Sequence, residues 1–155
     1  MSKKEYLEGR FEYFTQKELE NGKTIPDHLY QNIIPTASVL DLLRRKIREP
    51  IYINSTYRSP EYNRSVGGAK NSLHLFFNAI DFTIKRSSGF QKMFDLRTIY
   101  RILSDMDKYG ITEASNISLT KNNFGLGLYL RGIKSFIHLD TRGLIGMKAP
   151  ARWLG

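Results

Sequence analysis

The chain contains three histidines, and two of them, His74 and His138, lie in segments where a carboxylate follows at a short spacing. His74 precedes Asp81 by seven positions, and His138 opens the segment His138-Leu139-Asp140. Zinc accepts imidazole nitrogen and carboxylate oxygen as ligands, and three protein ligands leave its fourth position open, as in catalytic sites. These residue types are therefore compatible with a mononuclear catalytic zinc site built from His74, Asp81 and His138, although the spacing by itself is a weak signal.

The spacing alone leaves a second interpretation open. The same three residues can be unrelated polar side chains, each satisfied by its own hydrogen bonds. The chain contains no cysteine, which excludes disulfides and thiolate metal sites, so any zinc must be held by imidazole and carboxylate groups. A zinc site therefore requires a fold that brings these residues together.

Asp81 and His138 fall within two segments that are expected to be strands, residues 79–84 and 135–140. Neighbouring strands lie about 5 Å apart, so pairing of the two segments would bring Asp81 beside His138. The loop that carries His74 would then close over them. Further strands are expected at residues 51–56 and 125–129.

Three helices are expected from capping residues and from apolar side chains at helical spacing. The first begins with a capping box at residues 15–18 and ends at Asn21-Gly22. The second begins at Pro26-Asp27 and is closed by Pro50, and the third begins near Gln91 and is stopped by Gly110. Pro35 lies within the second helix and would kink or divide it. The apolar side of the third helix is expected to consist of Phe94, Ile99, Ile102, Leu103 and Met106.

The helices and strands do not alternate regularly along the chain. We therefore predict an α+β domain with a small antiparallel sheet that carries the zinc site and is flanked by helices. The chain has 155 residues and no visible linker or repeat, so residues 1–155 are expected to form a single domain.

Composition and charge limit the classes of partner that the protein can have. The net charge of +9 and the pI near 9.8 favour a polyanion, whether nucleic acid, an acidic cell-wall polymer or a membrane surface. No recognised nucleic-acid-binding motif accompanies this charge, so no nucleic-acid partner is expected. No segment has the ~18 apolar residues of a membrane span, and the first fifteen residues lack the apolar run of a secretory signal. Synthesis in the cytoplasm without a membrane span is expected.

A longer stretch of the sequence resembles a known family. The segments TYRSPEYN (56–63), VGGAKNSLH (66–74) and AID (79–81) are similar to those of the zinc D-Ala-D-Ala carboxypeptidase family. That family includes phage L-alanyl-D-glutamate endopeptidases and shares its fold with the zinc domain of hedgehog proteins. Its pattern is YRSPxxN, VGGAxxSxH and GxAxD, closed by a distant HxD or HxR. The resemblance is tight over 57–81 and loose over 26–140.

The resemblance implies Zn²⁺ as cofactor, with His74, Asp81 and His138 as ligands, and a substrate-binding role for Arg58. A permanently charged guanidinium can hold a peptide carbonyl or carboxylate while negative charge develops on the attacked oxygen. Asp140 is the expected general base, because residues two apart on a strand share a face. Two alternatives stay open for Asp140, a carboxylate that supports a ligand and a surface charge.

Five further positions affect this interpretation. Phe77 stands where the family usually has glycine, and if that glycine has a positive φ, the loop is expected to follow another route here. Ser72 is expected to support the loop of His74 rather than to act as a nucleophile. Gly67 and Gly68 either let the backbone pass close to the site or are ordinary loop glycines. Trp153 either packs into the core, which is the expected role, or contacts substrate.

The implied function is zinc-dependent hydrolysis of a peptidoglycan stem peptide, either between two D-Ala residues or between L-Ala and D-Glu. A phage or prophage lysis enzyme is expected, acting at the cell wall after release by a holin or as part of a virion. The alternative is a non-catalytic virion or wall-binding protein that keeps the fold, which Phe77, Ser135 and Phe136 favour because relatives often carry a glycine or a proton acceptor there. A basic nucleic-acid module would instead bind DNA in a salt-sensitive way without zinc. The sequence leaves the oligomeric state open.

Overall fold

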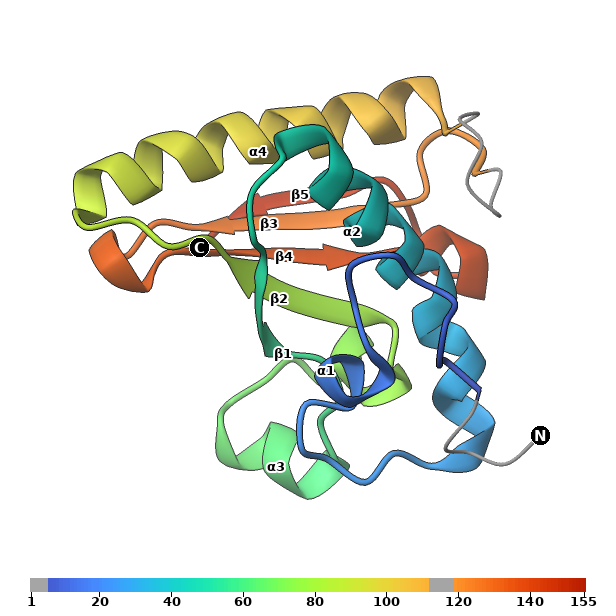
Figure 1. The fold of residues 1–155 in the computed structure, drawn as a ribbon. Coiled ribbons are helices and arrows are strands. Elements are labelled where there is room, and N and C mark those ends of the chain that lie inside the picture. Colours follow the sequence, from blue (N-terminus) through green and yellow to red (C-terminus); the bar gives the residue numbers. More distant parts are fainter. Residues whose placement is uncertain (1–5, 112–118) are drawn as a thin grey trace.

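Residues 6–111 and 119–155 are described by the computed structural model, and within them one five-stranded sheet has the order β1-β2-β4-β3-β5 (Figure 1). The strands are β1 (Tyr52–Ser55), β2 (Ala79–Thr83), β3 (Gly125–Tyr129), β4 (Phe136–Asp140) and β5 (Ala151–Leu154). The first four pair antiparallel, and β5 pairs parallel with β3. The predicted α+β class, with a sheet flanked by helices, is confirmed. Strand β5, which adds a parallel edge, was not predicted from the sequence.

The two faces of the sheet have different characters. Buried apolar side chains alternate along β2, β3 and β4, and they are Ile80 and Phe82, Leu126 and Leu128, and Ile137 and Leu139. Helices α2 (Ile33–Ile47) and α4 (Gly89–Tyr109) contact these strands, with α4 lying along the β3 side in Figure 1. Because side chains alternate between faces of a strand, Asp81, Gly127 and His138 belong to the opposite face.

The helix limits follow capping chemistry closely. Helix α1 (Gln16–Glu20) begins with the predicted capping box and ends at Asn21, which is left-handed. The predicted second helix is divided into a 3₁₀ helix, η2 (Asp27–Asn32), and α2. Pro35 lies in the first turn of α2, where a missing N–H leaves no intrahelical bond unmade.

Helix α4 begins two residues before the predicted limit and ends at Gly110, as expected. Its buried apolar side contains Leu96, Ile99 and Leu103, whereas Phe94 is 57% exposed, so its predicted place on that side is wrong. The short helices are α3 (Pro60–Ser65), η3 (Leu73–Phe76), η4 (Gly132–Lys134) and η5 (Arg142–Ile145). Among the helices of the described residues, none is both long and apolar enough to cross a membrane.

A buried polar network joins α2 to the chain on either side of the site. The hydroxyl of Thr36 donates to the backbone carbonyl of Asn78 at 2.7 Å. The Asn78 side chain donates to the hydroxyl of Thr141 at 2.9 Å and accepts from the Thr141 amide at 3.0 Å. Asn78 precedes β2 and Thr141 follows β4, so these bonds hold the ends of the two strands together.

Candidate metal centre

One row of paired residues across the sheet carries most of the candidate site. Asp81 on β2 pairs with His138 on β4, which pairs with Gly127 on β3, and Gly127 pairs in turn with Trp153 on β5. The expected pairing of the strands that carry Asp81 and His138 is therefore confirmed. The row places the carboxylate and the imidazole next to each other on the face opposite the core.

His74 reaches this row from η3, outside the sheet. Ser72 caps η3 and accepts a hydrogen bond from the His74 backbone N–H at 3.3 Å, while the His74 carbonyl accepts from the Arg58 backbone N–H at 3.1 Å. The ring Nδ1 of His74 lies 2.6 Å from the carbonyl oxygen of Thr56. Because a carbonyl can only accept, Nδ1 carries the proton and, in the neutral ring, Nε2 presents a lone pair.

That lone pair faces another acceptor. His74 Nε2 is buried without a hydrogen-bond partner and lies 3.2 Å from Oδ1 of Asp81. Two acceptor atoms at this distance repel each other unless a cation or a proton lies between them. The arrangement therefore suits a positively charged ligand shared by His74 and Asp81.

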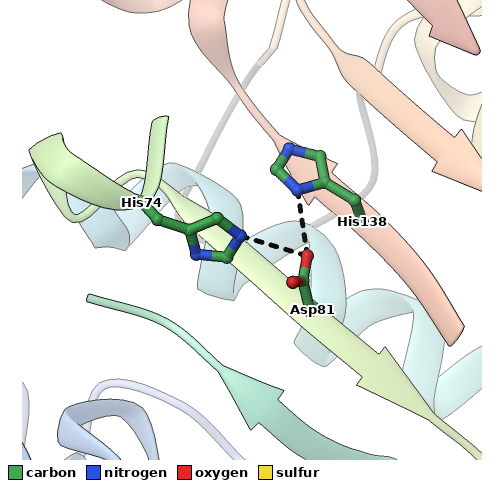
Figure 2. Close-up of side chains that lie close together, drawn as sticks. All are labelled: His74, Asp81 and His138. Atoms are coloured by element: carbon green, nitrogen blue, oxygen red, sulfur yellow. Dashed lines mark hydrogen bonds and ion pairs between the residues drawn. The ribbon is translucent and has the colours of Figure 1, made fainter. Parts of the chain in front are cut away.

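His138 completes the arrangement from the other side. Its Nδ1 lies 2.9 Å from Oδ1 of Asp81, and its Nε2 lies 2.7 Å from Oδ2 of Asp140. In the neutral ring, a proton on Nε2, donated to Asp140, leaves Nδ1 directed at Asp81 as an acceptor. The ligand atoms of His74, Asp81 and His138 all lie within 4.8 Å of one another, and Figure 2 shows the three side chains pointing at one another. This group could hold a metal ion.

The charges of the site depend on this proximity. Burial alone would raise the pKa of Asp81, but hydrogen bonds with His138 and His74 hold it well below its usual value. Burial alone would lower the pKa of His138, but Asp140 and Asp81 raise it to about 9. Asp81 is therefore anionic at neutral pH. The two carboxylates that contact His138, Asp81 and Asp140, favour a cation at the centre, whether a proton or a metal.

Asp140 lies behind His138 and not beside Asp81. It is completely buried and accepts from the Gly125 amide and from Arg142 through Nε at 2.9 Å and Nη2 at 2.8 Å. Burial would raise its pKa, but His138 and Arg142 lower it to about 2. The two ring nitrogens of His138 point in divergent directions, so Asp140 cannot reach a water that lies near Nδ1. This geometry contradicts the alternative of a surface charge, and it favours a carboxylate that supports a ligand over the expected general base.

Arg58 lies next to the centre. Its Nη2 is 3.7 Å from Oδ2 of Asp81, and its Nη1 is 3.5 Å from Oδ1 of Asn63. A Cβ at Gly68 would lie 2.0 Å from Asn63 Oδ1 and 3.2 Å from Arg58 Nη1, so Gly68 allows the backbone to pass close to this pair. Gly67 has φ +68° and open space around it, which is the behaviour of a loop glycine.

Phe77 adopts the left-handed conformation, in which a phenylalanine was expected to be strained. It caps η3 with φ 52° and ψ 44°. Its ring is completely buried and packs edge-to-face against Tyr30, with centroids 5.8 Å apart. Burial of a phenylalanine contributes ~1.5–3 kcal/mol, which is enough to offset the ~1–2 kcal/mol that a left-handed residue costs.

A cleft of about 600 Å³ opens over the centre. One side is formed by the loop around Gly68, and the other by Tyr129, Phe136 and Trp153. Trp153 is half-buried, with its ring centroid 5.1 Å from that of His138 and its Nε1 donating to the Tyr129 hydroxyl at 2.8 Å. It therefore lies in the cleft wall, where the less expected of its two roles, contact with substrate, becomes available.

The cleft wall that β3, β4 and β5 build was not predicted from the sequence. A signal for it was present in Gly125 and Gly127, which lie two apart on β3 and so share the face of the site. A Cβ at Gly125 would lie 2.4 Å from Arg142 Nε and 2.6 Å from the Asp140 carboxylate. Glycine within a strand often marks such a close approach.

A comparison with protein-family models identifies the family of the chain. The family model for Peptidase M15 matches residues 11–119, which is more than half of the chain and includes Arg58, His74 and Asp81. No curated protein matches the chain significantly. His138 lies beyond the matched segment, but the sheet pairs it with Asp81. The chain belongs to the Peptidase M15 family, whose members are metallopeptidases of the D-Ala-D-Ala carboxypeptidase type.

Proposed function

We propose that this protein is a zinc-dependent peptidase that hydrolyses a peptide bond in the stem peptide of peptidoglycan. The observation that carries the proposal is the convergence of three acceptor atoms, His74 Nε2, His138 Nδ1 and Asp81 Oδ1, on one point beneath the cleft. A set of two imidazoles and one carboxylate suits zinc. When bound there, zinc supplies a Lewis acid that polarises a carbonyl and acidifies water.

The second nitrogen of each imidazole supports this assignment. The Thr56 carbonyl accepts from Nδ1 of His74, and Asp140 accepts from Nε2 of His138. Such partners fix the tautomer and orientation of metal-binding histidines. We therefore assign Asp140 as a positioning residue.

Arg58 is placed to bind the substrate. Its guanidinium lines the cleft and lies beside Asp81, with the side chain 20% exposed. It can donate to the carbonyl of the bond that is cleaved and stabilise the negative charge that develops on its oxygen.

The cleft contains one carboxylate among its described lining residues, Asp81, which belongs to the metal group. Ser135, where some relatives have an acid, is buried, and its hydroxyl donates to the Gly132 carbonyl. A general base typically contributes ~10²–10⁴-fold to the rate, so we expect slow turnover. The same observation favours the second candidate function, a wall-binding or virion protein that retains the metal without cleavage.

The proposal includes a role at the bacterial cell wall, as a phage or prophage lysis enzyme. The net charge of +9 would attract the protein to an anionic wall polymer. The substrate, the phage context and the site of action are parts of this proposal.

Metal content and cleavage of muropeptides, measured on the same preparations, test the function. We compare the wild type with His138→Ala, and use His28→Ala as the matched control because His28 is exposed and outside the metal group. One zinc per chain and cleavage, both lost in His138→Ala and kept in His28→Ala, are expected. Zinc without cleavage of any muropeptide would favour the wall-binding or virion alternative, and absence of zinc would overturn the proposal.

A further inference from the structure

Three arginines line the cleft, and two of them already have a carboxylate neighbour. Arg142 holds Asp140 through two hydrogen bonds, and Arg58 lies 3.7 Å from Asp81. Arg131 differs, because no carboxylate of residues 6–111 or 119–155 forms an ion pair with it. Among the described residues, it is therefore the cleft arginine without a carboxylate partner.

An aromatic platform holds the Arg131 side chain. The rings of Tyr129 and Phe136 stack with centroids 4.4 Å apart and planes 5° apart. The guanidinium carbon of Arg131 lies 5.3 Å from the Tyr129 centroid and 5.7 Å from that of Phe136. Such cation–π contacts orient the guanidinium without using its N–H donors, and no described residue accepts from them, so the planar fork can bind a carboxylate.

The platform lies at a defined place relative to the metal group. Tyr129 pairs with Phe136 two positions along the strands from the pair of Gly127 and His138. Two residues of a strand span ~7 Å, and each residue of an extended peptide spans up to ~3.6 Å. A peptide whose carbonyl lies over the metal group therefore reaches the platform about two residues further along.

We propose that Arg131, held on Tyr129 and Phe136, is the binding site for a carboxylate of the substrate peptide and so determines which stem peptides are accepted. The inference rests on the proposed function. Two carboxylates of a stem peptide can supply the ligand, the C-terminal one and the free carboxyl group of the D-Glu residue. Both have the same chemistry, which is a planar anion that a guanidinium binds through two parallel hydrogen bonds.

The test uses three peptides and the zinc-loaded protein. The first is L-Ala-D-Glu-L-Lys-D-Ala-D-Ala with both carboxylates free, the second has its C-terminus amidated, and the third has the free carboxyl of D-Glu amidated. Binding is followed immediately after mixing by the fluorescence of Trp153, which is the single tryptophan of the chain and lies in the cleft wall. KM and kcat are measured in parallel.

Arg131→Gln and Arg131→Lys are compared with Lys134→Gln, which makes the same change of charge at an exposed residue that is not in the cleft lining. We expect Arg131→Gln to weaken binding of the first peptide and to raise KM about tenfold, with kcat nearly unchanged, as for loss of one charge-assisted pair. Arg131→Lys recovers part of the affinity, and Lys134→Gln has no effect. We expect one of the two amidated peptides to bind the wild type weakly and to lose no further affinity in Arg131→Gln. The carboxylate that is blocked in that peptide is then the one that Arg131 binds.

Equal weakening of all three peptides by Arg131→Gln would overturn the inference, as would a wild type that binds none of them. If the wild type binds the peptides in an Arg131-dependent way but cleaves none, the inference stands and the proposed enzymatic function fails. If cleavage occurs and Arg131→Gln leaves KM unchanged, the enzymatic function stands and the role of Arg131 fails.

Discussion

The indole of Trp153 lies directly against Gly127, its partner in the parallel pairing of β3 with β5. A Cβ at Gly127 would lie 2.3 Å from Nε1 and 2.5 Å from Cε2 of the indole. Real side chains do not approach so closely, so glycine at this position is what allows the indole to lie over β3 and to reach His138. The wall of the cleft thus depends on a residue that has no side chain.

Gly127→Ala is expected to displace Trp153 and to weaken peptide binding. Overpacking of this kind costs ~1–3 kcal/mol of stability, which urea unfolding can measure. The double variant with Trp153→Ala supplies the control, because removal of the indole removes the clash. Gly127→Ala should therefore cost markedly less in the Trp153→Ala background. Equal costs in both backgrounds would contradict the proposed contact.

Asp140→Asn separates a positioning role from a general-base role. If Asp140 orients His138, loss of its charge should lower zinc affinity by about 10–100-fold, as measured by competition with a chelator. Ser135→Ala is a useful comparison, because Ser135 is also buried near the start of β4 but its hydroxyl does not contact His138. A fall in kcat with unchanged zinc affinity would show that Asp140 acts on the proton instead.

Phe77 allows the cost of its backbone conformation to be measured. Phe77→Ala and Phe77→Gly both remove a buried ring, and loss of a buried phenylalanine typically costs ~3–5 kcal/mol. At an ordinary position the glycine variant would be the less stable of the two. At φ 52° we expect the reverse by about 1 kcal/mol, because glycine adopts the left-handed region without a Cβ penalty. Urea unfolding of the two variants decides between these orders.

Asp95 on α4 should contribute a small acid-dependent term to stability. Hydrogen bonds from Gln91 and Arg86 lower its pKa from the ordinary value of 3.8. A lowered folded-state pKa means that the unfolded chain binds the proton more tightly, so the contribution is complete above pH ~4 and is lost as the pH falls through the folded-state pKa. The size should stay below ~1 kcal/mol, as for exposed pairs.

Urea unfolding at pH 7 and pH 3 checks this expectation. Asp95→Asn should lower the stability at pH 7 and have a smaller effect at pH 3. Asp105→Asn, at an exposed position on the same helix, serves as control. An effect of Asp95→Asn that does not change between the two pH values would show that the ion pair is not its origin.

Local patterns predicted the strands β2 and β4 and the helix caps, because alternation and capping are properties of short segments. The candidate ligand group was predicted from those strands together with the family resemblance around His74. The strand β5 could not be predicted, since its four residues follow Pro150 and owe their extended form to pairing with β3. The orientation of the His138 ring could not be predicted either. The spacing of two residues places Asp140 on the same face of the strand as His138, but it does not say which ring nitrogen of His138 Asp140 contacts. Nor could the conformation of Phe77 be predicted, because the burial of its ring outweighs its backbone cost.

The single cross-strand row that carries Asp81 and His138 also links metal capture to correct strand pairing. Successive residues of a strand face opposite sides, so a slip of one residue between β2 and β4 would oppose Asp81 with Ile137 or Leu139 and leave the ligands on different faces. The three acceptors converge in one register alone. Under the proposed function, zinc would therefore stabilise the native register by ~2.7 kcal/mol at a hundredfold excess over its Kd, and it would discriminate against chains whose sheets are wrongly aligned.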